Sequence, residues 1–236
     1  GMSAFYSNQL TSISIPDGVK IIENGAFSNN QITTVVFPSG LTSIGPNAFG
    51  NNRISQIQIP DSVTSIGIGA FALNELSSLI IPENISLDRA AFSNNKLVSI
   101  KLPKSLKNLS DQLFQDNKLV SVEFPENLIS IGAWTFLNNK LNAINLPESL
   151  VSIGDRAFGG NQLAKIEIPK NVEAIGEGAF IGNEIGSLVI PDNVKTLGKD
   201  SFRSNKLTSL KLSNNLQIIS AGSFYGNQLE NLQIPQ

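Results

Sequence analysis

The sequence of 236 residues contains neither cysteine nor histidine. Without cysteine the chain has no disulfide, no thiol nucleophile and no thiolate metal site. Without histidine it lacks the usual general base, the Ser-His-Asp arrangement and the commonest zinc ligand. Only chemistry based on carboxylates, lysine, tyrosine or a Ser–Lys pair remains, so most hydrolase and metalloenzyme classes are excluded. We therefore expect a protein that is not an enzyme and that needs no cofactor or metal.

Charged residues are also scarce, and their signs nearly balance. They make up 15% of the chain, below the roughly 25% typical of soluble domains, and the net charge is −2. Nucleic acids and acidic membrane surfaces both require a basic footprint, so neither partner is expected. No apolar run approaches the roughly 18 residues needed to cross a bilayer, so we expect no direct membrane insertion.

The N-terminal residues contain no basic region followed by an apolar stretch, which a signal peptide requires. Gly1 precedes Met2, a pattern typical of a remnant of tag removal. We therefore expect residues 1–3 to be such a remnant together with N-terminal residues, and the chain to be a piece of a longer protein.

The dominant feature of the sequence is an internal repeat, the first signal to look for in any chain. Phenylalanine recurs at intervals of 22 residues, with a single interval of 21, at Phe5, Phe27, Phe49, Phe71, Phe92, Phe114, Phe136, Phe158, Phe180, Phe202 and Phe224. An asparagine stands three residues after every one of them, at Asn8, Asn30, Asn52, Asn74, Asn95, Asn117, Asn139, Asn161, Asn183, Asn205 and Asn227. This period predicts about eleven repeats.

Most positions of the repeat have a physical interpretation. In the first unit, Ile13 and Ile15 alternate with polar residues, which is the period of a short strand whose isoleucines point inward. Pro16 follows, and because proline lacks an N–H it ends the ladder of backbone bonds. Further along, several units carry a glycine, as at Gly45, and we expect this glycine to supply the positive φ of a tight turn.

A single unit cannot bury its apolar face, whereas stacked units share a continuous core. We therefore expect one solenoid domain over residues 4–236, with parallel strands on one face and turns or brief 3₁₀ segments on the other. The phenylalanines would form the spine of its core. The asparagines from Asn30 to Asn183 would form a structural ladder, because an inward amide can satisfy backbone donors and acceptors of neighbouring units.

The motif I-G-x-x-A-F-x-x-N-x-L-x-x-I-x-I-P is nearly intact in four segments, at 44–60, 66–82, 153–169 and 175–191. In this motif the chain resembles the BspA-like leucine-rich repeats of bacterial surface proteins, over essentially its whole length. The resemblance implies a β-rich leucine-rich repeat solenoid, α/β by convention. It also implies an extracellular or cell-surface location and, in some members, adhesion to host matrix proteins or partner bacteria. The chain departs from many members in its period of 22 rather than 23 and in having asparagine where they carry cysteine.

The outward residues of the predicted strands form two rows across the stack, and such variable positions are where a solenoid keeps its function. Lys101 and Glu123 are neighbours in one of these rows. The rows are small and polar with few charges, so they could bind a protein edge or a glycan through hydrogen bonds. A merely solvated sheet is the alternative.

The middle of the chain departs most from the repeat. One residue is missing between Ile85 and Ala91, and the single tryptophan, Trp134, stands in a column that we expect to face outward. That column contains Ala90, Gln112, Trp134 and Arg156 in successive units. We expect Arg156 to lie near the indole in a cation–π contact, and tryptophan and arginine are typical anchors of interfaces. Gln112, Trp134 and Arg156 are therefore candidate interaction residues, and an indole folded over a local irregularity is the alternative.

Two other patterns point to chemistry. Residues 67–72 fit the G-x-G-x-x-A dinucleotide pattern, but three of them fall on repeat positions and no helix with a ribose-binding acid follows. Four central carboxylates are close in sequence, as a glycosidase requires, at Asp111, Asp116, Glu123 and Glu126. They occupy different repeat positions and should point in different directions. The sequence thus favours a protein-interaction module that binds a protein or a glycan, with a structural spacer as the alternative and a glycan hydrolase as a third hypothesis.

Overall fold

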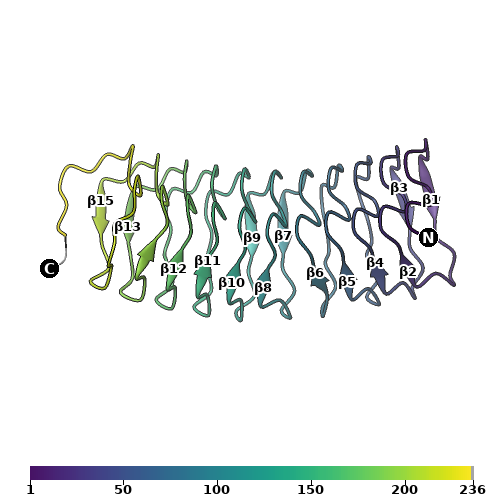
Figure 1. The fold of residues 1–236 in the computed structure, drawn as a ribbon, viewed down its shortest axis with the longest axis horizontal. Helices are drawn as coiled ribbons and strands as arrows, with labels where there is room; N and C mark the ends of the chain where they lie inside the picture. Colours follow the sequence, from purple (N-terminus) through teal and green to yellow (C-terminus); the bar gives the residue numbers. More distant parts are fainter. Residues whose placement is uncertain (235–236) are drawn as a thin grey trace.

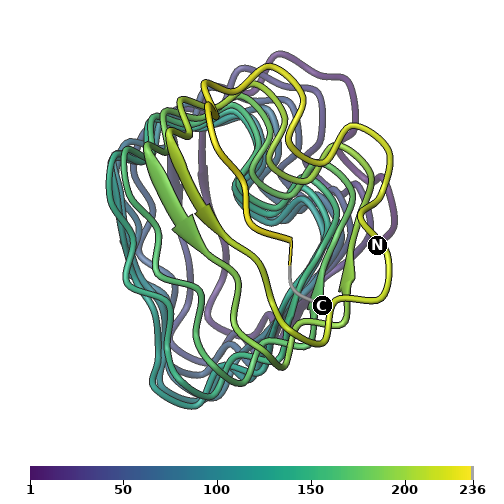
Figure 2. The ribbon, with the colours of Figure 1, turned by 90° about the vertical axis from the view of Figure 1, so that its left-hand side faces the viewer.

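The computed structural model describes residues 1–234 and shows a stack of coils running from one end of the molecule to the other (Figure 1). Viewed along the stack, each coil traces a ring with short strands on two of its sides (Figure 2). All strand pairs are parallel, as the repeat predicts. Pro235 was expected to end the last strand, but it lies outside the described residues.

The first row of strands coincides with the predicted I-x-I positions. It contains β1 (Ser12–Ser14), β3 (Thr34–Val36), β7 (Ser99–Lys101), β9 (Ser121–Glu123), β13 (Ser187–Val189) and β15 (Ser209–Lys211). These strands form three pairs, β1–β3, β7–β9 and β13–β15, each in register across one repeat. The central residue of each strand points inward and both neighbours are exposed, which confirms the predicted alternation.

A second row of strands lies on the return path, where we expected turns or 3₁₀ segments. It contains β2 (Ile21–Ile22), β4 (Ser43–Ile44), β5 (Ser65–Ile66), β6 (Ser86–Leu87), β8 (Asn108–Leu109), β10 (Ser130–Ile131), β11 (Ser152–Ile153), β12 (Ala174–Ile175) and β14 (Thr196–Leu197). Four of these strands form one sheet and five form another. The expectation of strands on one face only is therefore wrong. This row contains nine strands in the described residues, slightly fewer than the eleven repeats counted in the sequence.

The recurring glycine of the repeat has a different structural role from the one we expected. Gly45, Gly154 and Gly176 have ordinary negative φ, so they do not supply a left-handed turn. Instead, a Cβ on Gly154 would lie 2.7 Å from the backbone nitrogen of Ala133, in the preceding coil. The absence of a side chain lets neighbouring coils approach closely enough for the Gly154 N–H to donate to the carbonyl of Ile131, at 2.8 Å.

Serine at this glycine position changes the contact between coils. The Ser110 hydroxyl donates to the carbonyl of Leu87 at 2.6 Å, where other units use the glycine N–H. The sheet is interrupted at this point, between β6 and β8. Ser220 makes the same bond to the carbonyl of Leu197, and there only a single bridge joins Thr196 to the next coil. Serine therefore replaces a ladder bond by a side-chain bond.

The core is a continuous stack of phenylalanine rings flanked by aliphatic residues. Neighbouring rings of the spine are nearly parallel, with centroids between 5.1 Å apart (Phe5 and Phe27) and 6.0 Å apart (Phe92 and Phe114). The widest gap thus lies at the interruption between β6 and β8. From Phe49 to Phe202 the spine phenylalanines are completely buried.

At the N-terminus the first coil includes Ser3, whose N–H donates to the carbonyl of Asn24 at 2.8 Å. Among residues 1–234, no helix has the length and hydrophobicity that a membrane span requires.

Candidate functional site

The segment of each coil around its phenylalanine, which we call the turn side, contains two left-handed positions. The first left-handed column stands two residues before each phenylalanine, at Ser3, Gly25, Asn47, Gly69, Ala90, Gln112, Trp134, Arg156, Gly178, Asp200 and Gly222. The second stands two residues after it, at Ser7, Asn29, Asn51, Leu73, Asn94, Asp116, Asn138, Gly160, Gly182, Ser204 and Gly226. The sharp bends of the solenoid therefore lie at these columns.

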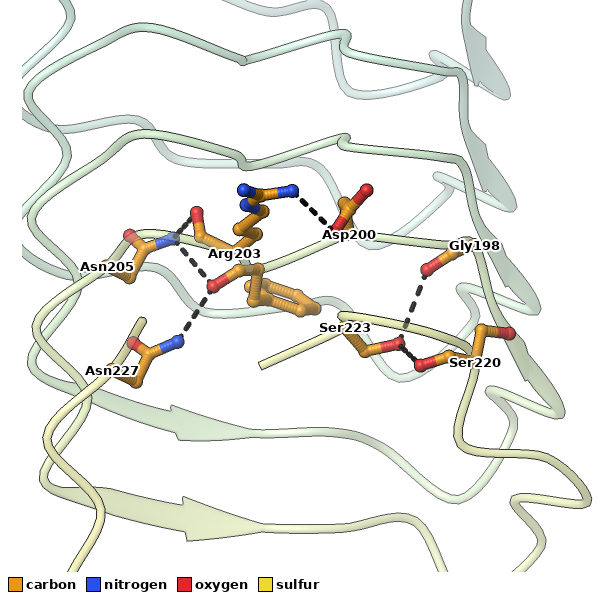
Figure 3. Close-up of polar contacts among 8 residues, drawn as sticks. Gly198, Asp200, Arg203, Asn205, Ser220, Ser223 and Asn227 are labelled. Atoms are coloured by element: carbon orange, nitrogen blue, oxygen red, sulfur yellow. Dashed lines mark hydrogen bonds and ion pairs between the residues drawn. The ribbon is translucent and has the colours of Figure 1, made fainter. Parts of the chain in front are cut away.

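The asparagine of each repeat directly follows the second left-handed column, and from Asn30 onward its side chain bonds to the preceding coil. Asn205 donates to the carbonyl of Phe180 in that coil at 2.9 Å and to Phe202 in its own coil at 3.1 Å. Its carbonyl oxygen accepts the N–H of Ile185 at 3.1 Å. Figure 3 shows the amides of Asn205 and Asn227 turned toward the chain around Phe202. These bonds satisfy backbone groups of two neighbouring coils, which is the contact pattern that a structural ladder requires.

The first left-handed column contains the candidate tryptophan and two of its companions. Seven coils place glycine, asparagine, aspartate or serine there, whereas four successive coils place Ala90, Gln112, Trp134 and Arg156, which we call the strained run. A left-handed conformation costs a residue with a Cβ roughly 1–2 kcal/mol. Backbone bonds to the next coil hold the conformation, as in the bond from the Trp134 N–H to the carbonyl of Asp155 at 2.7 Å. Strain of this kind persists where the surrounding structure fixes it, and it concentrates at functional sites.

Side chains of the strained run extend along the stack. Trp134 and Gln112 are half-buried and Arg156 is exposed. The Gln112 side-chain oxygen accepts a hydrogen bond from the guanidinium of Arg89 at 2.7 Å. The Cγ of Arg156 lies 3.2 Å from where a Cβ on Gly178 would stand, so this side chain extends over Gly178 in the following coil.

The cation–π contact expected between Arg156 and Trp134 is absent from the structure. Within residues 1–234 the one such contact has the guanidinium of Arg203 over the ring of Tyr225, 4.8 Å from its centroid. These two residues directly follow the spine phenylalanines, in a different column of the turn side. The sequence analysis missed this pair, although a scan of that column for neighbouring arginine and aromatic residues would have found it. Asp200 pairs with Arg203 at 3.4 Å (Figure 3).

Next to the strained run, Gly159 leaves room on the turn side for neighbouring side chains. Side chains of Leu137 and Ile181 converge over Gly159, where a Cβ would lie 3.0 and 3.1 Å from them. Both side chains are half-buried. Trp134, Leu137 and Ile181 therefore give this stretch of the turn side an apolar character, next to the cationic Arg156.

The outward residues of the first strand row are exposed, as expected, and form the strand face. Lys101 and Glu123, which are register partners in β7 and β9, form an ion pair at 2.7 Å. Both side chains are well exposed, so the pair contributes little to stability. Exposed apolar residues interrupt the polar rows at Val36, Ile80 and Val189.

Shallow hollows follow the strand face between successive coils, with volumes from about 330 to about 470 Å³. One of them lies between the coils of Lys101 and Glu123, with Phe124 in its lining. Another contains Lys165 and Glu167, whose ion pair at 2.7 Å lowers the pKa of Glu167. Open hollows of this kind suit side chains of a macromolecular partner better than an enclosed small molecule.

The residues of the carboxylate and dinucleotide patterns make the following contacts in the structure. The Asp111 carboxylate accepts the N–H of Ala133 at 2.8 Å, and the Asp116 carboxylate accepts the amide of Asn138 at 2.8 Å. Glu123 is engaged by Lys101, and Glu123 and Glu126 line the same open hollow of the strand face. Residues 67–72 belong to a coil whose chain continues without a helix, and no acidic cluster of metal-ligating type occurs in residues 1–234.

Comparison with known proteins agrees with the repeat. The sequence profile described as BspA type Leucine rich repeat region (6 copies) matches residues 1–120, 86–208 and 130–236. A comparison with curated protein sequences gives no significant match.

Several solved structures share the fold. A leucine-rich repeat protein from Bacteroides ovatus ATCC 8483 is 24% identical with a TM-score of 0.76, covering 100% of this chain and 70% of that one. The pneumococcal vaccine antigen PcpA is 26% identical with a TM-score of 0.65, covering 92% of this chain and 68% of that one. A leucine rich cell surface protein from Faecalibacterium prausnitzii A2-165 is 21% identical with a TM-score of 0.63, covering 98% and 77%.

Proposed function

This chain belongs to the BspA-type leucine-rich repeat family, and we propose that it is a non-enzymatic protein-interaction module of a bacterial cell-surface or secreted protein. The likeness to a pneumococcal vaccine antigen supports a location at the cell surface. A continuous core supports the proposal that the chain acts as one solenoid domain. In this proposal the module serves in adhesion or ligand binding.

The observation that carries this proposal is the strained run on the turn side. Four successive coils place Ala90, Gln112, Trp134 and Arg156 in a backbone conformation that glycine or asparagine would adopt more easily. The fold does not need these side chains, because the other coils bend in the same way without them. An indole and a guanidinium in adjacent coils are the residue types that dominate binding energy at protein interfaces.

A protein is the preferred ligand class in this proposal. The two outward rows of the strand face contain no aromatic residue on which a sugar ring could stack. On the turn side, Trp134 is half-buried beside Leu137, which suits an apolar side chain of a partner better than a polar sugar. Lys101 and Glu123 would then contribute polar contacts at the edge of a partner that also reaches the strand face.

The test is binding of the purified chain to an array of matrix proteins and glycans. The variant Trp134→Gly/Arg156→Gly removes both side chains and keeps the left-handed backbone at no steric cost. Asn47→Gly is the matched control, because Asn47 occupies the same column with φ 51°. We expect binding of a protein that the control retains and the double variant loses.

Two outcomes would contradict the proposal. Equal binding by the double variant and the control would remove the strained run from the site. Absence of any ligand on the array would favour the alternative function, a structural spacer that projects another domain from the cell surface.

A further inference from the structure

One column on the exposed surface has an unusual distribution of charge. Four residues after each phenylalanine, the coils place Gln9, Gln31, Arg53, Glu75, Lys96, Lys118, Lys140, Gln162, Glu184, Lys206 and Gln228. Opposite charges are neighbours at two places in this series, where Glu75 pairs with Lys96 at 2.8 Å and Glu184 with Lys206 at 3.0 Å. Lys118 and Lys140 directly follow Lys96, so three lysines stand in successive coils, the first of them paired.

The backbone holds these lysines side by side. The N–H of Lys118 donates to the carbonyl of Leu97 in the preceding coil at 3.0 Å, and the N–H of Lys140 donates to Leu119 at 2.9 Å. Coils joined in this way are about 4.8 Å apart. Like charges directly opposite one another on neighbouring backbone segments repel, so the row of lysines does not help to stabilise the fold.

The charge of the central lysines is not neutralised by the described residues. Lys118 and Lys140 are exposed and take part in no ion pair within residues 1–234. Asp116 is two residues from Lys118, but its carboxylate accepts the side-chain amides of Gln115 and Asn138, each at 2.8 Å. The column therefore presents unpaired positive charge to the solvent in an otherwise slightly acidic chain.

Apolar side chains border the lysines on the same surface. Val98 and Val120 stand two residues after Lys96 and Lys118, with exposed fractions of 48% and 39%. The bond from the Val120 N–H to the Val98 carbonyl at 2.8 Å keeps the two valines adjacent. We call Lys96, Lys118, Lys140, Val98 and Val120 the lysine stripe.

We infer that the lysine stripe is a docking surface for an acidic polypeptide segment that also carries apolar side chains. Charge complementarity favours an anionic partner, since Lys118 and Lys140 lack a counterion in the described part of the chain. The exposed valines favour a polypeptide over a purely polar polyanion, because only a peptide presents apolar groups between its carboxylates. This inference names a partner chemistry for the proposed interaction module and so rests on the proposed function, but it uses none of the residues of the strained run.

The experiment measures binding of a fluorescein-labelled peptide of alternating glutamate and valine by fluorescence anisotropy. Lys118→Glu is the test variant. Lys107→Glu is the matched control, because Lys107 is exposed, directly precedes β8 and its substitution changes the net charge equally. We expect Lys118→Glu to weaken binding by about tenfold or more and the control to change it by less than about twofold. Val98→Ser/Val120→Ser should weaken peptide binding while leaving the binding of inorganic polyphosphate unchanged.

A structural side effect can be separated from loss of binding. Lys118→Glu places a carboxylate between Lys96 and Lys140, so this variant should melt at the same temperature as the wild type or higher. Equal peptide binding by Lys118→Glu and Lys107→Glu would overturn the inference. So would polyphosphate binding as tightly as the peptide with no effect of the valine substitutions. Both results leave the test of Trp134 and Arg156 untouched, so failure here and failure of the proposed function are distinguishable.

Discussion

The side-chain amide of Asn139 donates to the carbonyl oxygen of Phe114, one coil earlier, at a distance of 3.0 Å. Its own carbonyl oxygen accepts the N–H of Leu119 at 2.9 Å. Asn139→Ala would leave the buried N–H of Leu119 without a partner, at a cost of roughly 1–3 kcal/mol. The carbonyl of Phe114 would keep only the hydrogen bond from the side-chain amide of Asn117, at 3.2 Å. We therefore expect urea denaturation to show a loss of about 1–3 kcal/mol in the free energy of unfolding.

Two further variants separate this effect from loss of a side chain as such. Asn8→Ala should be nearly neutral, because Asn8 is exposed and its side chain donates only to the carbonyl of Tyr6. Asn139→Asp should keep the bond from Leu119 but place a carboxylate against the carbonyl of Phe114. That variant should become less stable as the pH rises, since burial among carbonyl groups disfavours the ionised form. Full stability of Asn139→Asp at pH 7 would contradict this account.

The phenylalanine spine gives a second prediction. Phe158 is completely buried, with rings 5.4 Å away on both sides, at Phe136 and Phe180. Phe158→Ala should cost roughly 3–5 kcal/mol, the usual penalty for truncating a buried phenylalanine. Phe5→Ala should cost clearly less, because Phe5 is 49% exposed and stacks on one side only. Chemical denaturation of the two variants side by side measures the difference, and equal losses would refute the spine.

The recurring glycine of the repeat gives a third prediction. A Cβ on Gly154 would lie within 2.9 Å of three backbone atoms of the preceding coil, and backbone cannot move aside as a side chain can. Gly154→Ala should therefore lower the free energy of unfolding by roughly 1–3 kcal/mol. Gly186→Ala is the control: nothing lies within 4 Å of its Cβ position and its φ is not positive. Differential scanning calorimetry should find the control neutral or slightly more stable, and a neutral Gly154→Ala would disprove the close approach.

The sequence predicted the elements that depend on residue identity at a fixed period. Phe158 and Asn139 recur in register with their neighbours, so the spine and the inward position of the amides follow from the spacing of 22. Strand direction and register follow for the same reason, because each unit must repeat the path of the one before. These features need no knowledge of the backbone beyond its periodicity.

Features that depend on local backbone angles were not predicted. Gly154 could serve either a left-handed turn or a close approach, and only the dihedral angle decides between them. Arg156 was expected near Trp134, yet its side chain extends over Gly178 in the following coil. The sequence did contain a signal for the left-handed column, because most coils place glycine, asparagine, aspartate or serine there. Trp134 departs from that preference, and its half-buried position alone would not have shown this.

Acid should lower the stability of the solenoid by protonating two exposed carboxylates, those of Glu83 and Asp192. The backbone N–H of Lys104 donates to the Glu83 carboxylate and lowers the pKa of Glu83 below its ordinary 4.5. The N–H of Asn214 lowers the pKa of Asp192 below 3.8 in the same way. A pKa depressed in the folded state adds stability above the ordinary pKa, and this stability is lost as the pH falls through the lowered value.

The melting temperature should therefore decrease as the pH falls below 4.5, in a scan from pH 6 to pH 2.5. In the variant Glu83→Gln/Asp192→Asn this decrease should be smaller, because the two carboxylates no longer titrate. The neutral side chains can still accept a hydrogen bond, so the variant should fold normally at pH 6. If the melting temperature of the variant followed the wild-type pH profile throughout, Glu83 and Asp192 would not contribute to the loss of stability in acid.

Relief of backbone strain at Arg156 provides the last prediction. Arg156 has φ 51° and is exposed, and its left-handed conformation costs roughly 1–2 kcal/mol that glycine would not incur. Glycine also gains freedom in the unfolded chain, which offsets about 0.5–1 kcal/mol of that relief. Arg156→Gly should therefore stabilise the protein by about 0.5–1 kcal/mol in urea denaturation. Lys199→Gly, at an exposed position of ordinary φ one residue earlier in its repeat, should be destabilising by a similar amount.

A stabilised Arg156→Gly that has lost its ligand would mean that stability is sacrificed for binding at this position. A destabilised one would mean that the arginine is held by structural contacts along Gly178, and the strained run would then lose its claim to be a binding site.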